Sequence, residues 1–257
     1  AMDEPALKDW LDVKFKQFAS SDFIATDPIS IPHQFKAKED REIAGFLTAT
    51  LSWGQRPTIL KNAQRLLDWM DNAPHDFILH HTLADVKPFS SFVHRTFNGT
   101  DCLFFLSCLR QLYTRYGCLE QVFLQAQESE EEDLGPVWFR FRRLFCGELE
   151  PGRTGKHLPN PLKGAAAKRW NMWLRWMVRP ATEGVDFGIW KKVSPACIHL
   201  PLDLHSGKTA RTLGLLHRKQ DDWKAVRELT LTLRRFDPAD PCKYDYALYG
   251  AGVFERF

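Results

Sequence analysis

The stretch KGAAAKRWNMWLRWMVRP, from Lys163 to Pro180, decides the fold. Gly164 permits a tight turn, three alanines follow, and an apolar run then continues to Pro180, which cannot extend a helix. Three tryptophans and two methionines cover most of the surface of this run, so it has no clean polar stripe. A helix that is apolar on nearly all sides is mostly buried. The stretch therefore predicts a buried helix with Lys168 in its first turns and partly enclosed.

Helical spacing also dominates the chain on both sides of this stretch. Apolar residues recur at every third or fourth position, and no run alternates in the way that a strand or a hairpin requires. We expect an all-α fold of roughly ten helices joined by short loops. The clearest predicted helices lie within 40–53, 56–70, 98–117, 221–238 and 240–253.

One long stretch is rich in helix breakers, ELEPGRTGKHLPNPLKG at 148–164. We expect it to join two helical lobes, residues 1–150 and residues 151–257, with a cleft between them. The second lobe would carry a helix-hairpin-helix-like element. The N-terminal and C-terminal helices could still pack on one another.

The charge of the chain is ordinary in total but uneven in its distribution. The 257 residues carry a net charge of +3 and are 44% hydrophobic, which is enough for one large core or two small ones. Between Pro151 and Thr182 there are seven lysines and arginines and no acidic residue, whereas acid gathers in the run ESEEED at 128–133. A basic segment of this kind favours a surface that faces phosphates.

Cysteine usage and hydropathy indicate the compartment. The six cysteines are scattered and include no CxxC pair, so neither a disulfide framework nor a zinc or iron–sulfur site is expected. No apolar stretch approaches the length that crosses a bilayer, and no signal-peptide pattern is evident. We expect a cytoplasmic protein without a membrane partner.

Two residues far apart in the sequence suggest chemistry. Lys168 lies near the start of a helix beside Arg169, where positive charge favours the neutral, nucleophilic amine. Asp203 follows 35 residues later in PLDLH (203 − 168 = 35), and its carboxylate could take the proton of that amine or stabilise a developing cation. The helix after Asp203 would bind phosphates through its free N-terminal amides and through the basic side chains His205, Lys208 and Arg211.

Simpler interpretations stay open for both residues. Asp203 could be an ordinary helix N-cap, which is compatible with a catalytic role, and Lys168 could be a solvated surface lysine. His199, Asp203 and His205 could form a metal site. However, an aspartate at a helix start and a histidine two residues later diverge in direction. We therefore expect no metal.

The segments GAAAK, PLDLH and KTARTLGLL together resemble the helix–hairpin–helix DNA glycosylase superfamily, in the endonuclease III and 8-oxoguanine glycosylase group. The similarity spreads over about residues 42–253, because EIAGFLTATLSWGQRPTILKNAQRLL resembles the first helices of that group and YDYALYGAGV its closing helix. Hairpin and spacing are most similar to the archaeal 8-oxoguanine glycosylase. The chain also resembles a bacterial family known only as a domain of unknown function.

This resemblance implies a DNA base-excision glycosylase with β-lyase activity, which removes a damaged purine such as 8-oxoguanine from double-stranded DNA. Lys168 would attack the anomeric carbon of a flipped nucleotide and form a Schiff base, with assistance from Asp203. Lys163, five positions earlier, is a rival nucleophile.

The resemblance also implies the surrounding residues. The base pocket would contain Trp53, Gln55, Met172 and Arg175, and the DNA-binding residues of the hairpin region would be Lys163, Gly164 and Arg169. No iron–sulfur cluster is expected, since no clustered cysteines follow Cys242, while the hairpin leaves room for a monovalent cation. A monomer associated with the nucleoid is implied.

Two alternatives remain. The hairpin LPNPLKGAAAK has one glycine where the family typically has two, which favours a non-catalytic nucleic-acid-binding module of the same fold. A metal-dependent phosphoesterase would use His199, Asp203 and His205.

Overall fold

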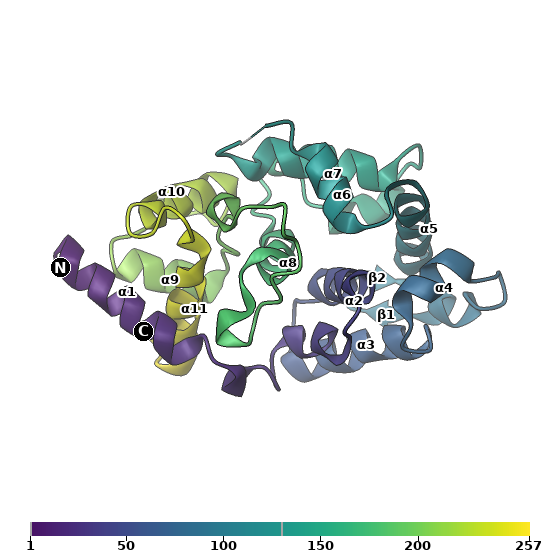
Figure 1. Ribbon diagram of the computed structural model, residues 1–257, viewed down its shortest axis with the longest axis horizontal. Coiled ribbons are helices and arrows are strands. Elements are labelled where there is room, and N and C mark those ends of the chain that lie inside the picture. Colours follow the sequence, from purple (N-terminus) through teal and green to yellow (C-terminus); the bar gives the residue numbers. More distant parts are fainter. Residues whose placement is uncertain (1, 130) are drawn as a thin grey trace. The chain divides into compact units, whose positions relative to one another are not determined.

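The computed structural model describes residues 2–129 and 131–257, and it confirms the predicted all-α fold (Figure 1). Glu130, within the acidic run, lies outside the described residues. Short 3₁₀ turns join many of the helices. The α-helices are α1 (Glu4–Phe18), α2 (Lys38–Thr50), α3 (Arg56–Asp68), α4 (Pro74–His80), α5 (Gly99–Tyr116), α6 (Leu119–Ala126), α7 (Leu134–Cys146), α8 (Lys168–Val178), α9 (Leu204–Thr212), α10 (Trp223–Arg234) and α11 (Tyr244–Phe254).

One small strand pair departs from the expectation that no hairpin is present. β1 (Val93–His94) and β2 (Phe97–Asn98) pair antiparallel, and the turn between them places Arg95 at a φ of 53°. Each strand has two residues, which is too short for an alternating pattern to show in the sequence.

The chain divides into two compact units. Unit 1 comprises residues 1–25, 130–136 and 160–257, and unit 2 comprises residues 26–129 and 137–159. The passage from 159 to 160 falls inside the breaker-rich stretch, but the division differs from a single cut after residue 150. The N-terminal helix belongs with the C-terminal ones.

Packing of α1 against α11 explains why the N-terminus belongs to unit 1 (Figure 1). At Gly250 on α11, an added Cβ would lie 2.3 Å from the ring of Phe18 on α1, so only glycine permits this approach. The Phe18 ring also stacks on Phe254, with centroids 5.8 Å apart. Helices α1 and α11, although far apart in the sequence, therefore pack together within unit 1.

The core of unit 1 is built around α8, which is buried as its sequence predicts. Trp170, Trp173 and Trp176 are each no more than 2% exposed. Trp173 meets Trp190 edge-on at 5.0 Å, and the Trp190 amide donates to the Met177 carbonyl at 2.9 Å. The segment after α8 thus folds back along the helix and covers it.

The core of unit 2 is aromatic, and buried acids, among them Glu42, lie within it. Phe46 of α2 lies 5.9 Å from Phe105 of α5 and 5.3 Å from Phe145 of α7 between ring centroids. Glu42, also on α2, is fully buried and accepts hydrogen bonds from the Leu119 amide at 2.7 Å and the Tyr113 hydroxyl at 2.8 Å. Glu42 therefore caps α6, whose own N-cap side chain makes no capping bond.

Candidate functional site

Lys168 and Asp203 come together in unit 1. The Lys168 Nζ lies 4.0 Å from Asp203 Oδ2, and the two side chains are 30% and 21% exposed. The pair is therefore in contact with solvent and is not closed into a tight hydrogen bond. An amine and a carboxylate in this arrangement can both reach a bound molecule.

The two oxygens of the Asp203 carboxylate have different partners: Oδ1 caps a helix and Oδ2 faces Lys168. Asp203 is the N-cap of α9, and its Oδ1 accepts from the Ser206 amide at 2.9 Å. The Ser206 hydroxyl in turn accepts from the Asp203 amide at 3.0 Å, which completes a capping box. Because the cap occupies Oδ1, the carboxylate is held in one orientation with Oδ2 toward Lys168.

Irregular backbone places Lys168 at the start of α8. Gly164 has a φ of 95°, and Ala167, the N-cap of α8, has a φ of 51° and a ψ of 34°. The Gly164 carbonyl accepts from the Trp223 amide of α10 at 3.0 Å. Asn171 donates to the Leu200 carbonyl at 3.4 Å and so ties α8 to the segment that precedes Asp203. The turn and the segment are therefore both anchored in unit 1.

A third charged residue at this site, Asp245 of α11, was not predicted from the sequence as a site residue. Burial raises the pKa of its carboxyl to about 6, and the negative charge of Asp203 adds to the shift, while Arg175 and Lys168 oppose it. A single acid in an otherwise apolar helix was the available signal. Asp245 places a second carboxyl group within electrostatic reach of the Lys168–Asp203 pair.

Arg175, a predicted base contact, lies in a buried network. Its guanidinium donates to Asp245 at 2.5 Å and to Asp186 at 3.3 Å, and the residue is 7% exposed. Arg179, one turn later, pairs with Asp186 and Asp240, each at 2.9 Å. Carboxylates from three segments thus neutralise both arginines, so Arg175 would have to exchange partners to contact a base.

The basic stretch 151–182 is consequently not one continuous positive surface. Besides Arg175 and Arg179, Arg153 of unit 2 is paired with Asp101 at 2.5 Å. Arg169, a predicted DNA contact, is half-buried, and burial lowers its pKa to about 10. Lys163 and Gly164 are exposed in the turn that precedes α8.

The three predicted phosphate-binding residues on α9 differ in accessibility. His205 and Lys208 are exposed, and the His205 ring lies edge-on to Tyr249 with centroids 6.1 Å apart. Arg211 is half-buried, donates to the Arg218 carbonyl at 2.8 Å and pairs with Asp221 at 2.5 Å. Only the first two present side chains that a phosphate could meet without displacing an acid.

The other predicted base-pocket residues fall in different units. Met172 is buried in unit 1 at 8% exposure. Trp53 of unit 2 is half-buried, with its ring 4.8 Å from His94 and 5.8 Å from His157 between centroids. Gln55 is exposed and precedes α3 without making a side-chain cap bond.

The alternative interpretation of His199, Asp203 and His205 as a metal site requires metal ligands that lie close together, and the described residues 2–129 and 131–257 contain no such group. No group of three or more His, Cys, Asp or Glu side chains there is arranged to hold a metal ion. His199 stacks on Trp223 at 5.1 Å, its Nδ1 lies 2.9 Å from the Cys197 carbonyl, and burial lowers its pKa to about 4. His205 is exposed on α9. His199 is therefore a buried residue of the core.

The helices are short or polar in comparison with membrane spans. Throughout the part of the chain that the structure describes, none has the length and apolar composition of a bilayer-crossing segment.

Comparison with known proteins gives a family but no activity. Neither the curated proteins nor the solved structures contain a match to the chain. Residues 27–254, which include Lys168, Asp203 and Asp245, match the model of one protein family. The chain therefore belongs to the family described as a protein of unknown function, DUF2400.

Proposed function

We propose that the protein is a DNA base-excision glycosylase with β-lyase activity, acting on a damaged purine such as 8-oxoguanine. One observation carries the proposal: Lys168 and Asp203, 35 positions apart (203 − 168 = 35), lie 4.0 Å from one another with both side chains part-exposed. The resemblance of the hairpin and of PLDLH to the helix–hairpin–helix glycosylases supports the same assignment.

The pair can perform the reaction with few other groups. In this scheme the Lys168 Nζ, in its neutral form, attacks the C1′ carbon of a nucleotide flipped out of the helix. The base leaves with the electron pair of the glycosidic bond, and a proton lost from the amine allows the sugar ring to open to an imine. β-Elimination of the 3′ phosphate can follow, after which water releases the lysine.

Asp203 suits a supporting role. Its Oδ2 can accept the proton that the amine loses and can stabilise the positive charge that develops on the sugar. Since Oδ1 is fixed by the Ser206 amide at 2.9 Å, this carboxylate need not reorganise when the charge appears. Ordered groups aimed at a developing charge are the most effective ones.

The experiment is a cleavage assay on duplexes that carry different damaged bases, with the whole chain and two lysine variants. Lys168→Gln should abolish strand cleavage and borohydride trapping. Lys163→Gln removes the rival nucleophile, an exposed lysine five positions earlier; it should weaken DNA binding but keep strand cleavage and trapping at saturating duplex, so it serves as the matched control for the nucleophile. If Lys168→Gln cleaves as well as the wild type, the assignment of Lys168 as the nucleophile is wrong. If the wild type turns over none of the damaged duplexes, the proposal that the protein is a glycosylase is wrong.

A non-catalytic nucleic-acid-binding module is the second candidate. It is favoured by the exposed Lys163 and Lys208, together with a hairpin that has one glycine. This candidate predicts that DNA affinity falls steeply with salt while no base is released and no strand is cut. Lesion-dependent turnover would exclude it.

A further inference from the structure

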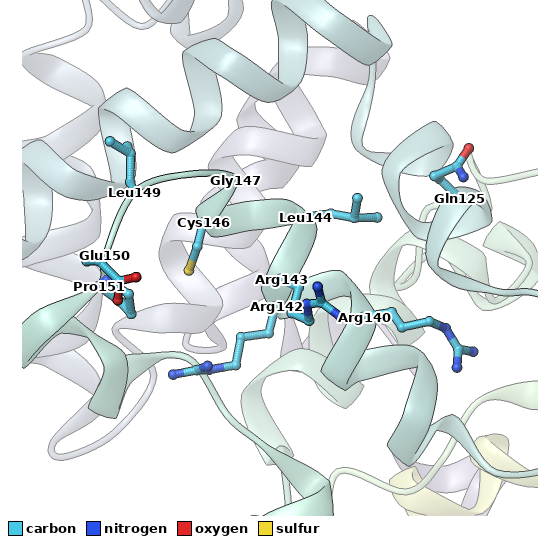
Figure 2. A pocket seen from close by; sticks show the side chains of 10 residues that line it. All are labelled: Gln125, Arg140, Arg142, Arg143, Leu144, Cys146, Gly147, Leu149, Glu150 and Pro151. Carbon is cyan, nitrogen blue, oxygen red and sulfur yellow. The ribbon is translucent and has the colours of Figure 1, made fainter.

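Three arginines of α7 line a hollow in unit 2. From Val137 onward, α7 belongs to this unit, and Arg140, Arg142 and Arg143 border a hollow of about 400 Å³ (Figure 2). The remaining lining comes from Gln125, Leu144, Cys146, Gly147, Leu149, Glu150 and Pro151. We call this feature the arginine hollow; all of its residues lie in unit 2 and none was singled out by the sequence analysis.

Two of these arginines have no acidic partner among the described residues. The Arg142 Nε donates to the Leu158 carbonyl at 3.2 Å, which fixes the guanidinium without neutralising it. Arg143 is exposed. Within residues 2–129 and 131–257, no carboxylate oxygen lies within 4.0 Å of either guanidinium. A half-buried guanidinium that is oriented by a carbonyl, beside an exposed one, can bind an anion.

The third arginine extends the positive charge toward the other end of the hollow. Arg140 donates to the Ala126 carbonyl at 2.6 Å and lies 3.7 Å from Glu128. Figure 2 shows the Arg140 and Arg142 side chains extending to opposite sides, with Arg143 between them. The positive charges are therefore spread along a surface and do not converge on one point.

Only one acid, Glu150, stands among the described residues that line the arginine hollow. It forms no ion pair within 4.0 Å in the described part of the chain. Three arginines and one glutamate give the lining a formal charge of +2 (3 − 1 = 2). Glu150 therefore repels any anionic ligand. Its removal should change the affinity for an anion in the direction opposite to the removal of an arginine.

We propose that the arginine hollow binds the phosphodiester backbone of a nucleic-acid strand. The choice of a nucleic-acid partner rests on the proposed function, whereas the site itself does not. Charges spaced along a surface suit a chain of phosphates better than one small anion, and arginine pairs with phosphate through two parallel hydrogen bonds. Leu144 and Leu149 supply apolar surface for the sugars. Binding here is independent of base sequence.

The test measures the affinity of the whole chain for an undamaged duplex by fluorescence anisotropy, between about 50 and 200 mM salt. The double variant Arg142→Gln/Arg143→Gln should lower the slope of log affinity against log salt by about 2, close to 0.9 for each lost phosphate contact. Affinity at the lowest salt should fall by roughly tenfold or more. Arg143→Gln alone, at an exposed position, should lower the slope by about 1 and keeps the test valid if the double variant unfolds.

Two further variants act as controls. Glu150→Gln should raise the affinity, because it removes the one negative charge of the lining. Arg65→Gln/Lys87→Gln removes two exposed charges of unit 2 that lie outside the hollow and should leave the slope unchanged.

The outcomes separate this proposal from the proposed function. A double variant with the wild-type slope overturns the arginine hollow as a phosphate site, even if Lys168-dependent cleavage of damaged DNA is intact. Loss of cleavage in Lys168→Gln, together with a lowered slope in Arg142→Gln/Arg143→Gln, supports both proposals. A wild-type chain that shows no salt-dependent binding overturns the arginine hollow, while turnover on damaged duplexes decides the enzyme separately.

Discussion

The two ends of α8 carry basic side chains in opposite circumstances. At the N-terminal end, the Lys168 side chain is 30% exposed and lies 4.0 Å from the oxygen of Asp203. At the C-terminal end, the Arg175 and Arg179 side chains are 9% and 3% exposed, and each contacts two carboxylates within 3.3 Å. The closed network stabilises the fold, whereas the open pair keeps an amine and an acid available to a ligand.

Energetics supports this division of roles. A buried ion pair contributes little when compared with an apolar replacement, but removal of one partner leaves an uncompensated charge and is strongly destabilising. A part-exposed pair contributes about 0–1 kcal/mol. Substitutions along one helix should therefore separate stability from chemistry.

The largest effect is expected for Arg175→Met. The substitution removes the positive charge that contacts Asp186 and Asp245. It should therefore lower the free energy of unfolding, measured by urea denaturation, by about 3–5 kcal/mol. Adding Asp245→Asn should restore part of the loss, since the two residues are in direct contact. A loss below about 1 kcal/mol in the single variant would contradict a structural role for the network.

The next effect is the pH dependence caused by Asp245. Its pKa rises from 3.8 to about 6 on folding, so the folded protein binds this proton more tightly than the unfolded chain does. The resulting stability is present below about pH 4 and is lost as the pH rises through 6. At pH 7 the loss amounts to about 3 kcal/mol relative to pH 4.

Asp245→Asn removes this titration. The difference in unfolding free energy between wild type and variant, measured in urea from acidic to neutral pH, should therefore shift against the wild type as the pH rises. A difference that stays constant over this range would show that Asp245 does not titrate there.

A smaller effect is expected for Ala167→Gly. Ala167 has a φ of 51°, and the left-handed region costs a non-glycine residue about 1–2 kcal/mol. Glycine relieves this strain but gains freedom in the unfolded chain, so the variant should be more stable by about 0.5–1 kcal/mol. Ala165→Gly, at a position without positive φ, is the matched control and should lower the melting temperature instead.

The smallest effect on stability is expected for Lys168→Met. Because the contact with Asp203 is 4.0 Å long and part-exposed, the free energy of unfolding should change by no more than about 0.5 kcal/mol. A change comparable to that of Arg175→Met would mean that Lys168 is a structural residue, and the contrast between the two ends of α8 would disappear.

Local signals in the sequence predicted much of this architecture. Gly164, the apolar run and Pro180 predicted α8 and its burial, and the position of Asp203 before a helix predicted the N-cap that the structure contains. These features depend on neighbouring residues alone. The strand pair at Val93–Asn98 was missed because strands of two residues leave no periodic pattern.

The long-range contacts could not be read in the same way. Asp186 and Asp245 lie 11 and 70 positions from Arg175, and nothing in their local sequence indicates that they meet it. Arg175 therefore looked accessible in the sequence. The proximity of Lys168 and Asp203 was suggested by resemblance, and the distance itself required the structure.

The most direct test of the central claim is to locate the covalent bond. The whole chain is incubated with borohydride and a duplex that contains 8-oxoguanine or another damaged purine, and the trapped complex is digested and mapped by mass spectrometry. We expect the sugar remnant to be attached to Lys168 Nζ. Attachment to Lys163 or another amine, or absence of an adduct on every damaged duplex, would contradict it.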